Sequence, residues 1–257
     1  MENRPFILEP KKVELKPCVI FSSGIMAVGK TSVMTALAKR ISNAFYLDRD
    51  DINQGNSYVS PTHTDELPDF EKYVAHAGIY PDHMHKVVTP FGQMWKVDPH
   101  NAFYRRHLRD QSYFVQMHLA RTNLEAGKVP IIDCITTRQI QDGTLKKIID
   151  SGFFSSHPSY LIHFACDEDE CYDRAVARSK ADEAARKRVD LIRGNGRTAS
   201  PTSSRESFHR FMTEEQPMIP KELRTHPHLL INTSGKKVSQ CVDECLNHLG
   251  YQVRKTE

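Results

Sequence analysis

The sequence Gly-Ile-Met-Ala-Val-Gly-Lys-Thr at residues 24–31 decides the fold class of this 257-residue chain. The apolar run at residues 17–22 precedes it and predicts a buried strand, and residues 31–42 follow with apolar side chains at helical spacing. A strand, a loop of the form Gly-x-x-x-x-Gly-Lys-Thr and an amphipathic helix together make a P-loop, which binds nucleoside triphosphate phosphates. We therefore expect a P-loop NTPase core.

The residue types of this loop suit phosphate binding. Its glycines let the backbone curl so that successive N–H groups face the phosphates, and the following helix adds the positive end of its dipole. Lys30 is expected to reach the β- and γ-phosphates, and Thr31 to offer its hydroxyl to Mg²⁺. ATP and Mg²⁺ are thus the predicted cofactors. The loop residues predicted to bind the nucleotide are Gly24, Ile25, Met26, Ala27, Val28, Gly29, Lys30, Thr31 and Ser32.

The rest of the chain alternates strands and helices. Strands are predicted at residues 44–47, 129–134, 160–166 and 228–232, and helices at 103–126, 138–151, 167–179, 203–216 and 236–249. This alternation predicts one α/β domain over residues 1–257, a three-layer α/β/α core with a mostly parallel five-stranded sheet. Ligands of such sheets bind at the carboxyl ends of the strands.

Residues 55–100 interrupt this regularity with five prolines and many histidines and aromatic residues. We expect a helical or irregular insertion of loops and short helices, placed to contact the acceptor. Aromatic side chains with a few polar groups suit an organic small molecule, and they also suit stacking on a nucleic-acid base.

An acidic run, Asp48-Arg49-Asp50-Asp51, follows the second predicted strand. It is expected to place carboxylates near the γ-phosphate, where one of them can accept the proton of an attacking hydroxyl. Asp51 is the member that we expect to act only as a helix cap.

A P-loop followed by Asp-Arg-Asp-Asp resembles the small P-loop kinases related to polynucleotide kinase, zeta-toxin kinases and chloramphenicol phosphotransferase, which share a nucleoside monophosphate kinase-like fold. In polynucleotide kinase the run reads Asn-Arg-Asp-Asp, and the first Asp after the Arg is the general base, so the resemblance implies that role for Asp50. It covers residues 17–51 and, more loosely, 129–250. Where polynucleotide kinases have an Arg that helps to bind nucleic acid, this chain has Ile52-Asn53-Gln54.

Asp133 ends the predicted strand at residues 129–134. An aspartate at this place can hold Mg²⁺ through water or order the substrate, as in Walker B elements, and a simple turn or helix cap is the alternative. Arg138 follows near the same edge. Because related kinases often use an arginine here on substrate or phosphate, the resemblance implies a catalytic role for Arg138, and an ordinary surface arginine is the alternative.

Arginines are concentrated after the fourth strand of the core. Arg174 and Arg178 are four residues apart and share a helix face, and a basic segment at residues 180–200 includes Arg186. Guanidinium groups neutralise a transferring phosphoryl group, so Arg174 and Arg178 are candidate catalytic residues, and Arg174 and Arg186 candidate nucleotide ligands. Residues 180–200 match the lid of nucleoside monophosphate kinases. The alternative is a solvated helix whose arginines pair with acidic neighbours.

The last predicted strand runs into Thr233-Ser234-Gly235. In the related kinases the backbone of this loop often lines the adenine pocket, so the resemblance implies a base-binding loop here. The alternative is a plain turn between a strand and a helix, capped by Thr233 or Ser234.

The bulk composition limits the class of protein. The net charge of +3 is small, and no run approaches the roughly 18 apolar residues of a membrane span. The N-terminus lacks the apolar core of a secretory signal, and six scattered cysteines suit buried free thiols in a reducing compartment. We therefore expect a cytoplasmic protein with no membrane partner.

Three hypotheses remain at this level. The first is an ATP-dependent kinase that phosphorylates a hydroxyl of a small molecule such as a nucleoside, sugar or antibiotic. The second keeps that chemistry with a nucleic-acid hydroxyl as acceptor. The third is a toxin-like or regulatory P-loop NTPase.

Overall fold

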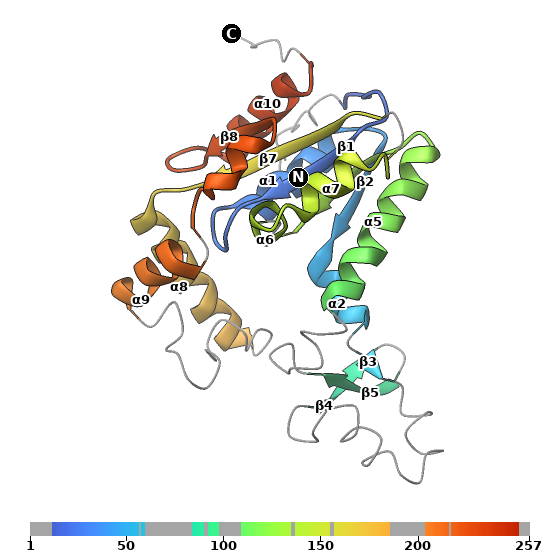
Figure 1. The fold of residues 1–257 in the computed structure, drawn as a ribbon. Coiled ribbons are helices and arrows are strands. Elements are labelled where there is room, and N and C mark those ends of the chain that lie inside the picture. The colour runs from blue at the N-terminus through green and yellow to red at the C-terminus, as the bar shows by residue number, and fades with distance from the viewer. Residues whose placement is uncertain are drawn as a thin grey trace, which may run out of the picture. The chain divides into compact units, whose positions relative to one another are not determined.

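The computed structural model describes residues 12–56, 58–59, 84–89, 92–97, 109–134, 137–154, 157–185, 204–215 and 217–251 (Figure 1). The chain divides into two compact units. The first comprises Met1–Leu47, Ala120–Asp167 and Gln216–Glu257, and the second Asp48–Leu119 and Glu168–Glu215.

A five-stranded parallel sheet with flanking helices forms the first unit (Figure 1). Its strands are β1 (Val19–Ser23), β2 (Ala44–Asp48), β6 (Val129–Asp133), β7 (Ser159–Ala165) and β8 (His228–Asn232), in the order β2-β6-β1-β7-β8. Strand β1 is central, with Ile20 opposite Ile131 of β6 and Tyr160 of β7. The residues of β1 and β6 are all buried, as expected for strands covered on both faces. The predicted α/β/α core is confirmed.

The helices of this unit are α1 (Lys30–Arg40), α6 (Thr137–Gln141), α7 (Thr144–Asp150), the 3₁₀ helix η4 (Lys221–Thr225) and α10 (Val238–His248). Helix α1 packs against α10, which buries Cys241, Val242, Cys245 and Leu246 along one face. The prediction of one helix at residues 138–151 is wrong. Gly143 lies between α6 and α7 with φ 74°, a left-handed conformation that ends the first helix.

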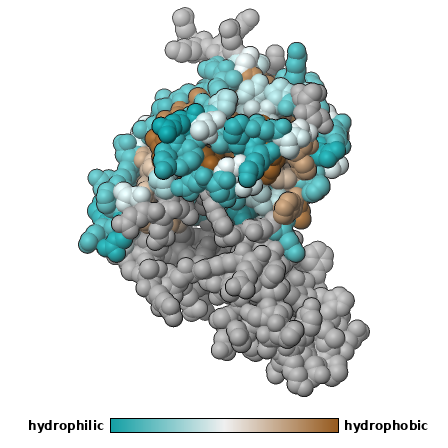
Figure 2. Space-filling model, viewed as in Figure 1, coloured by the Kyte–Doolittle hydropathy of each residue, from teal (hydrophilic) through white to brown (hydrophobic). Residues whose placement is uncertain are grey.

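The six cysteines are buried free thiols, as predicted. Most of the described surface visible in Figure 2 is hydrophilic, with few apolar side chains among the polar ones. Within the described ranges, no helix is both long and apolar enough to span a membrane.

The second unit contains helices and a small sheet. The helices are α2 (Arg49–Asn56), most of α5 (Arg109–Glu125), α8 (Glu168–Ala185), α9 (Arg205–Arg210) and the π-helix η3 (Phe211–Glu215). Helix α5 continues into the first unit and ends just before Gly127, whose φ is 79°. This glycine ends the helix as the sequence predicts.

The structure of the described part of the insertion differs from the prediction. Loops and short helices were expected there, but β3 (Tyr58–Val59), β4 (Met84–Thr89) and β5 (Gly92–Val97) form an antiparallel sheet in the order β3-β5-β4. The five prolines that suggested irregular chain all lie outside these three strands. Proline therefore separates the strands and does not interrupt their hydrogen bonds.

Candidate nucleotide-binding site

The P-loop connects the end of β1 at Ser23 to the start of α1 at Lys30. Three of its residues have positive φ: Gly24 at 133°, Ala27 at 63° and Gly29 at 84°. A Cβ atom on Gly24 would lie 2.5 Å from the carbonyl oxygen of Phe164, at the end of β7. The loop is thus pressed against the neighbouring strand, and glycine is required at its first position.

Replacing Gly24 with alanine should destabilise the fold by about 3 kcal/mol, because the new Cβ meets backbone in a conformation that alanine rarely adopts. Gly152→Ala is the matched control. Gly152 also has positive φ (70°), but no atom lies within 4 Å of its added Cβ, so its loss should be about 1 kcal/mol. Urea unfolding measures both values. Equal losses would contradict the close approach of the loop to β7.

A buried polar cluster surrounds Asp133 at the carboxyl end of β6. The Lys30 ammonium lies 2.7 Å from Oδ1 of Asp133, and the Tyr46 hydroxyl donates to Oδ2 at 2.7 Å. The Ser22 hydroxyl, which has one proton to donate, lies 3.1 Å from both Ile132 O and Asp133 Oδ1. The Asp133 side chain is only 2% exposed. The P-loop lysine thus faces a strand-end carboxylate that two hydroxyl groups, those of Ser22 and Tyr46, also contact.

These contacts keep Asp133 ionised. Burial raises its pKa, but the Lys30 ammonium lowers it, through its charge and through a hydrogen bond. Hydrogen bonds from Tyr46 and Thr31 lower it further, and the net pKa of Asp133 lies below its ordinary value. An anionic carboxylate and the hydroxyl of Thr31 thus lie within hydrogen-bonding reach of each other.

The Asp133 contribution to stability should depend on pH. Because its folded-state pKa is lowered, the carboxylate stabilises the fold above its unfolded pKa of about 3.9, and this effect disappears as pH falls through the folded pKa. Asp133→Asn should therefore lose about 3 kcal/mol at pH 7, where Lys30 remains half-buried without its counter-charge. The gap to the wild type should narrow below about pH 4. Urea unfolding across pH tests this, with exposed Asp142→Asn as control, and a gap that stays constant would contradict it.

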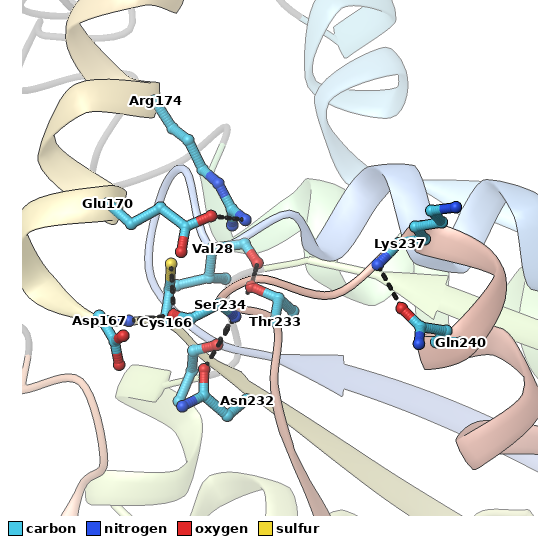
Figure 3. A network of polar contacts seen from close by, with 11 residues as sticks. Val28, Cys166, Asp167, Glu170, Arg174, Asn232, Thr233, Ser234, Lys237 and Gln240 are labelled. Atoms are coloured by element: carbon cyan, nitrogen blue, oxygen red, sulfur yellow. Dashed lines mark hydrogen bonds and ion pairs between the residues drawn. The ribbon is translucent and has the colours of Figure 1, made fainter.

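The loop after β8 is bonded to the P-loop (Figure 3). The Thr233 hydroxyl donates to the carbonyl oxygen of Val28 at 2.8 Å. The Ser234 hydroxyl accepts a hydrogen bond from the N–H of Asp167 at 2.6 Å, and its N–H donates to Oδ1 of Asn232 at 3.0 Å. The segments that follow β1, β7 and β8 are thus joined at one end of the sheet. The adenine-binding role of this loop stays a prediction.

Asp50 lies in the first turn of α2 and is exposed. Its N–H donates to Oδ1 of Asp48 at 2.8 Å, so Asp48 is the carboxylate that caps the start of this helix. The expectation that Asp51 acts as the cap is wrong. A capping residue directly precedes the helix, whereas Asp51 lies within its first turn. Asp50 follows the capping residue Asp48 by two positions and belongs to the second unit.

Three of the four predicted site arginines lie in described helices. Arg174 and Arg178 both lie in α8, and the guanidinium of Arg174 is 2.5 Å from a carboxylate oxygen of Glu170, one turn earlier. The prediction of a shared helix face agrees with α8, and so does the alternative in which Arg174 pairs with an acidic neighbour. Arg138 lies in α6, and Arg186 lies outside the described residues, as does most of the predicted lid.

An arginine that the sequence analysis missed, Arg205 of α9, binds the acidic start of α8. It forms ion pairs with Asp169 and with Asp173, the latter at 2.9 Å, and lies 4.8 Å from the centre of the Tyr172 ring. His209 is 2.8 Å from Glu168 on the same two helices. The acidic first turn of α8 therefore binds α9.

Sequence reasoning also missed Ser22 and Tyr46, which contact Asp133, and the P-loop contact of Thr233. Ser22 lies two residues before Gly24 and Tyr46 four residues before Asp50, and this closeness to predicted site residues was the available signal. The structure brings together Lys30 and Asp133 of the predicted residues in the first unit, whereas Asp50, Arg174 and Arg178 belong to the second.

Comparison with known proteins shows the fold alone. No protein-family model matches the chain, and no curated protein matches it in sequence. A solved candidate kinase of Chloroflexus aurantiacus J-10-fl is 15% identical, with a TM-score of 0.51 over 92% of this chain and 97% of that one. This chain shares the α/β fold of that structure.

Two other similar structures have lower TM-scores. A gluconokinase of Sinorhizobium meliloti 1021 is 13% identical, with a TM-score of 0.43 over 92% of this chain and 93% of that one. A thymidylate kinase of Candida albicans is 11% identical, with a TM-score of 0.45 over 91% and 92%.

Proposed function

We propose that this chain is an ATP- and Mg²⁺-dependent kinase that transfers the γ-phosphoryl group to a hydroxyl of a small organic molecule. The observation that carries the proposal is the Lys30–Asp133 pair, 2.7 Å apart, beside a P-loop whose glycines have the required positive φ. The α/β fold that the chain shares with the candidate kinase of Chloroflexus aurantiacus supports it. A backbone nest, a lysine and a strand-end carboxylate in this order bind the phosphates and metal of ATP in such folds.

The residues present fit Mg²⁺. This ion prefers oxygen ligands, and the exposed Thr31 hydroxyl and the ionised Asp133 carboxylate supply them within hydrogen-bonding reach of each other. We propose that Thr31 binds the ion directly and Asp133 through water. When bound, Mg²⁺ neutralises charge on the phosphates. Lys30, which now contacts Asp133, would then turn its ammonium to the β- and γ-phosphates.

The proposed reaction transfers the γ-phosphoryl group and one proton. The bond between the γ-phosphorus and the oxygen bridging to the β-phosphorus breaks, and a bond from that phosphorus to the acceptor oxygen forms. We propose that the carboxylate of Asp50 accepts the hydroxyl proton, so that the products are ADP and a phosphate ester. Lys30, Arg138, Arg174 and Arg178 are proposed to stabilise the charge on the transferring group, and Arg174 and Arg186 to bind ATP.

The acceptor is proposed to contact the insertion at residues 55–100, with residues 180–200 as a lid over the nucleotide. Aromatic and polar residue types in the insertion favour an organic acceptor of modest size. The run Ile52-Asn53-Gln54, which lacks the arginine that polynucleotide kinases have at this place, favours a small molecule over a nucleic acid.

The test is a transfer screen with γ-labelled ATP. Nucleosides, sugars, aminoglycoside-like and other hydroxyl-bearing compounds are assayed beside single- and double-stranded oligonucleotides, each with wild type and Lys30→Met. Label transfer to a small molecule by the wild type alone is the expected result. Transfer only to oligonucleotides would replace the acceptor class. ATP hydrolysis without transfer to any acceptor would point to a regulatory NTPase and overturn the proposal.

A further inference from the structure

The side chain of Thr233 contacts two other segments of the first unit. It lies directly after β8 and is 3% exposed. Its hydroxyl donates to the carbonyl oxygen of Val28 at 2.8 Å and lies 3.3 Å from that of Ala165, while its N–H donates to Ala165 O at 2.9 Å (Figure 3). A residue more than 200 positions away in sequence thus holds one peptide group of the P-loop.

The hydrogen bond to the Val28 carbonyl also orients the N–H of Gly29, because of the geometry of the peptide group. The carbonyl of Val28 and the N–H of Gly29 belong to one planar trans unit, in which the two groups point in opposite directions. Fixing the Val28 oxygen on Thr233 therefore fixes the direction of the Gly29 N–H. That N–H is one of the donors of the P-loop, next to Lys30 at the start of α1.

The loop needs such external support. Ala27 has φ 63°, a conformation that is unfavourable for a residue with a Cβ and persists only where its surroundings impose it. Gly24 is fixed by its approach to Phe164, but it lies four residues before Val28. Val28 itself is fully buried, so its carbonyl has no water to replace a lost partner.

We propose that Thr233 is a positioning residue for the phosphates of the nucleotide. Its hydroxyl orients the Val28–Gly29 peptide so that the Gly29 N–H faces the phosphate site, and it links that orientation to the loop after β8. This inference rests on the proposed function, since it assumes that the P-loop binds phosphate. A merely structural role would lower stability and leave the intrinsic affinity for phosphate unchanged.

Pyrophosphate without metal is the probe, because it can contact the P-loop and carries no base. Calorimetry in EDTA compares wild type with Thr233→Val, which keeps the size of the side chain and removes the hydroxyl, and with Thr233→Ser, which keeps the hydroxyl. Thr225→Val is the matched control, since Thr225 also donates to a backbone carbonyl, that of Glu222 at 2.7 Å, but lies exposed in helix η4.

Thr233→Val should weaken pyrophosphate binding about tenfold, the value of one lost hydrogen bond to an orienting group, while Thr233→Ser stays within about twofold of wild type. Thr225→Val should bind as wild type. Circular dichroism on the same samples reads folding, and Thr233→Ala, which adds no atom, replaces the valine variant if that one does not fold.

Three results would overturn the inference. The valine variant could bind pyrophosphate as tightly as wild type while folded, or the serine variant could lose as much affinity as the valine variant. If wild type itself binds neither pyrophosphate nor ADP, the proposed function fails together with the inference, whereas the first two results leave the function standing.

Discussion

Lys30→Met should lower kcat/KM for phosphoryl transfer about 10³-fold, the effect of removing one charged group that stabilises the transferring phosphoryl. Methionine is unbranched and only one atom shorter than lysine, so it keeps most of the packing of the side chain. The proposed function gives the Lys30 ammonium two partners in turn, Asp133 in the free protein and the phosphates of ATP in the complex. Steady-state kinetics with the acceptor from the screen measure the loss. Lys39→Met, an exposed change in the last turn of the same helix, should leave kcat/KM within about twofold.

Lys30→Met should also affect stability, and a second substitution separates this effect from the effect on catalysis. Removing Lys30 leaves the Asp133 carboxylate buried without its cation, which should destabilise the fold by about 3 kcal/mol at pH 7. In the double variant Lys30→Met, Asp133→Asn no charge is left unpaired, so stability should largely return while kcat/KM stays as low as in Lys30→Met. The stability of the double variant thus tests the ion pair, and its kinetics test separately the role of Lys30 in transfer. Recovery of transfer in the double variant would contradict the assignment of Lys30 to the phosphates.

Asp50→Asn should lower kcat about 10³-fold and leave the KM for ATP within about twofold, because a general base acts on the acceptor and not on nucleotide binding. Asparagine keeps the shape of the side chain and cannot accept a proton. The backbone around it is held independently, since the N–H of Asp50 donates to Asp48. The start of α2 should therefore survive the change.

Asp51→Asn is the matched control, one residue further along the same exposed turn. Its kcat should stay within about threefold of wild type, because a neighbouring surface charge acts only weakly through water. Full transfer by Asp50→Asn would show that another group accepts the proton. A comparable loss in both variants would mean that the charge of the turn matters and not one base.

The parts of the fold that the sequence predicted are those with local or periodic signals. The P-loop is recognisable because residues 24–31 form the loop from their own glycines, between an apolar strand and an amphipathic helix. The strand β8 and the end of α5 before Gly127 were predicted because apolar runs and a left-handed glycine act within a few residues.

The errors arose where a local signal has two outcomes. Prolines in the insertion suggested irregular chain, but they separate strands. Gly143 inside a helical pattern can be tolerated or can end the helix, and here its positive φ ends it. Two aspartates beside a helix start can each cap it, and the backbone direction after β2 selected Asp48 over Asp51.

The sequence by itself determined the P-loop, the five strands of the parallel sheet, and the choice of Lys30 and Asp133 as candidate site residues, because these depend on neighbours along the chain. Only the tertiary structure decided that Gly24 approaches Phe164, that Tyr46 and Ser22 bind Asp133, and that Thr233 holds the Val28 carbonyl. The contacts of Gly24, Tyr46 and Ser22 join strands that are adjacent in the sheet and distant in the chain, and the contact of Thr233 joins the segments after β8 and β1, on either side of β7. Strand order sets such contacts, and no spacing within one segment encodes them.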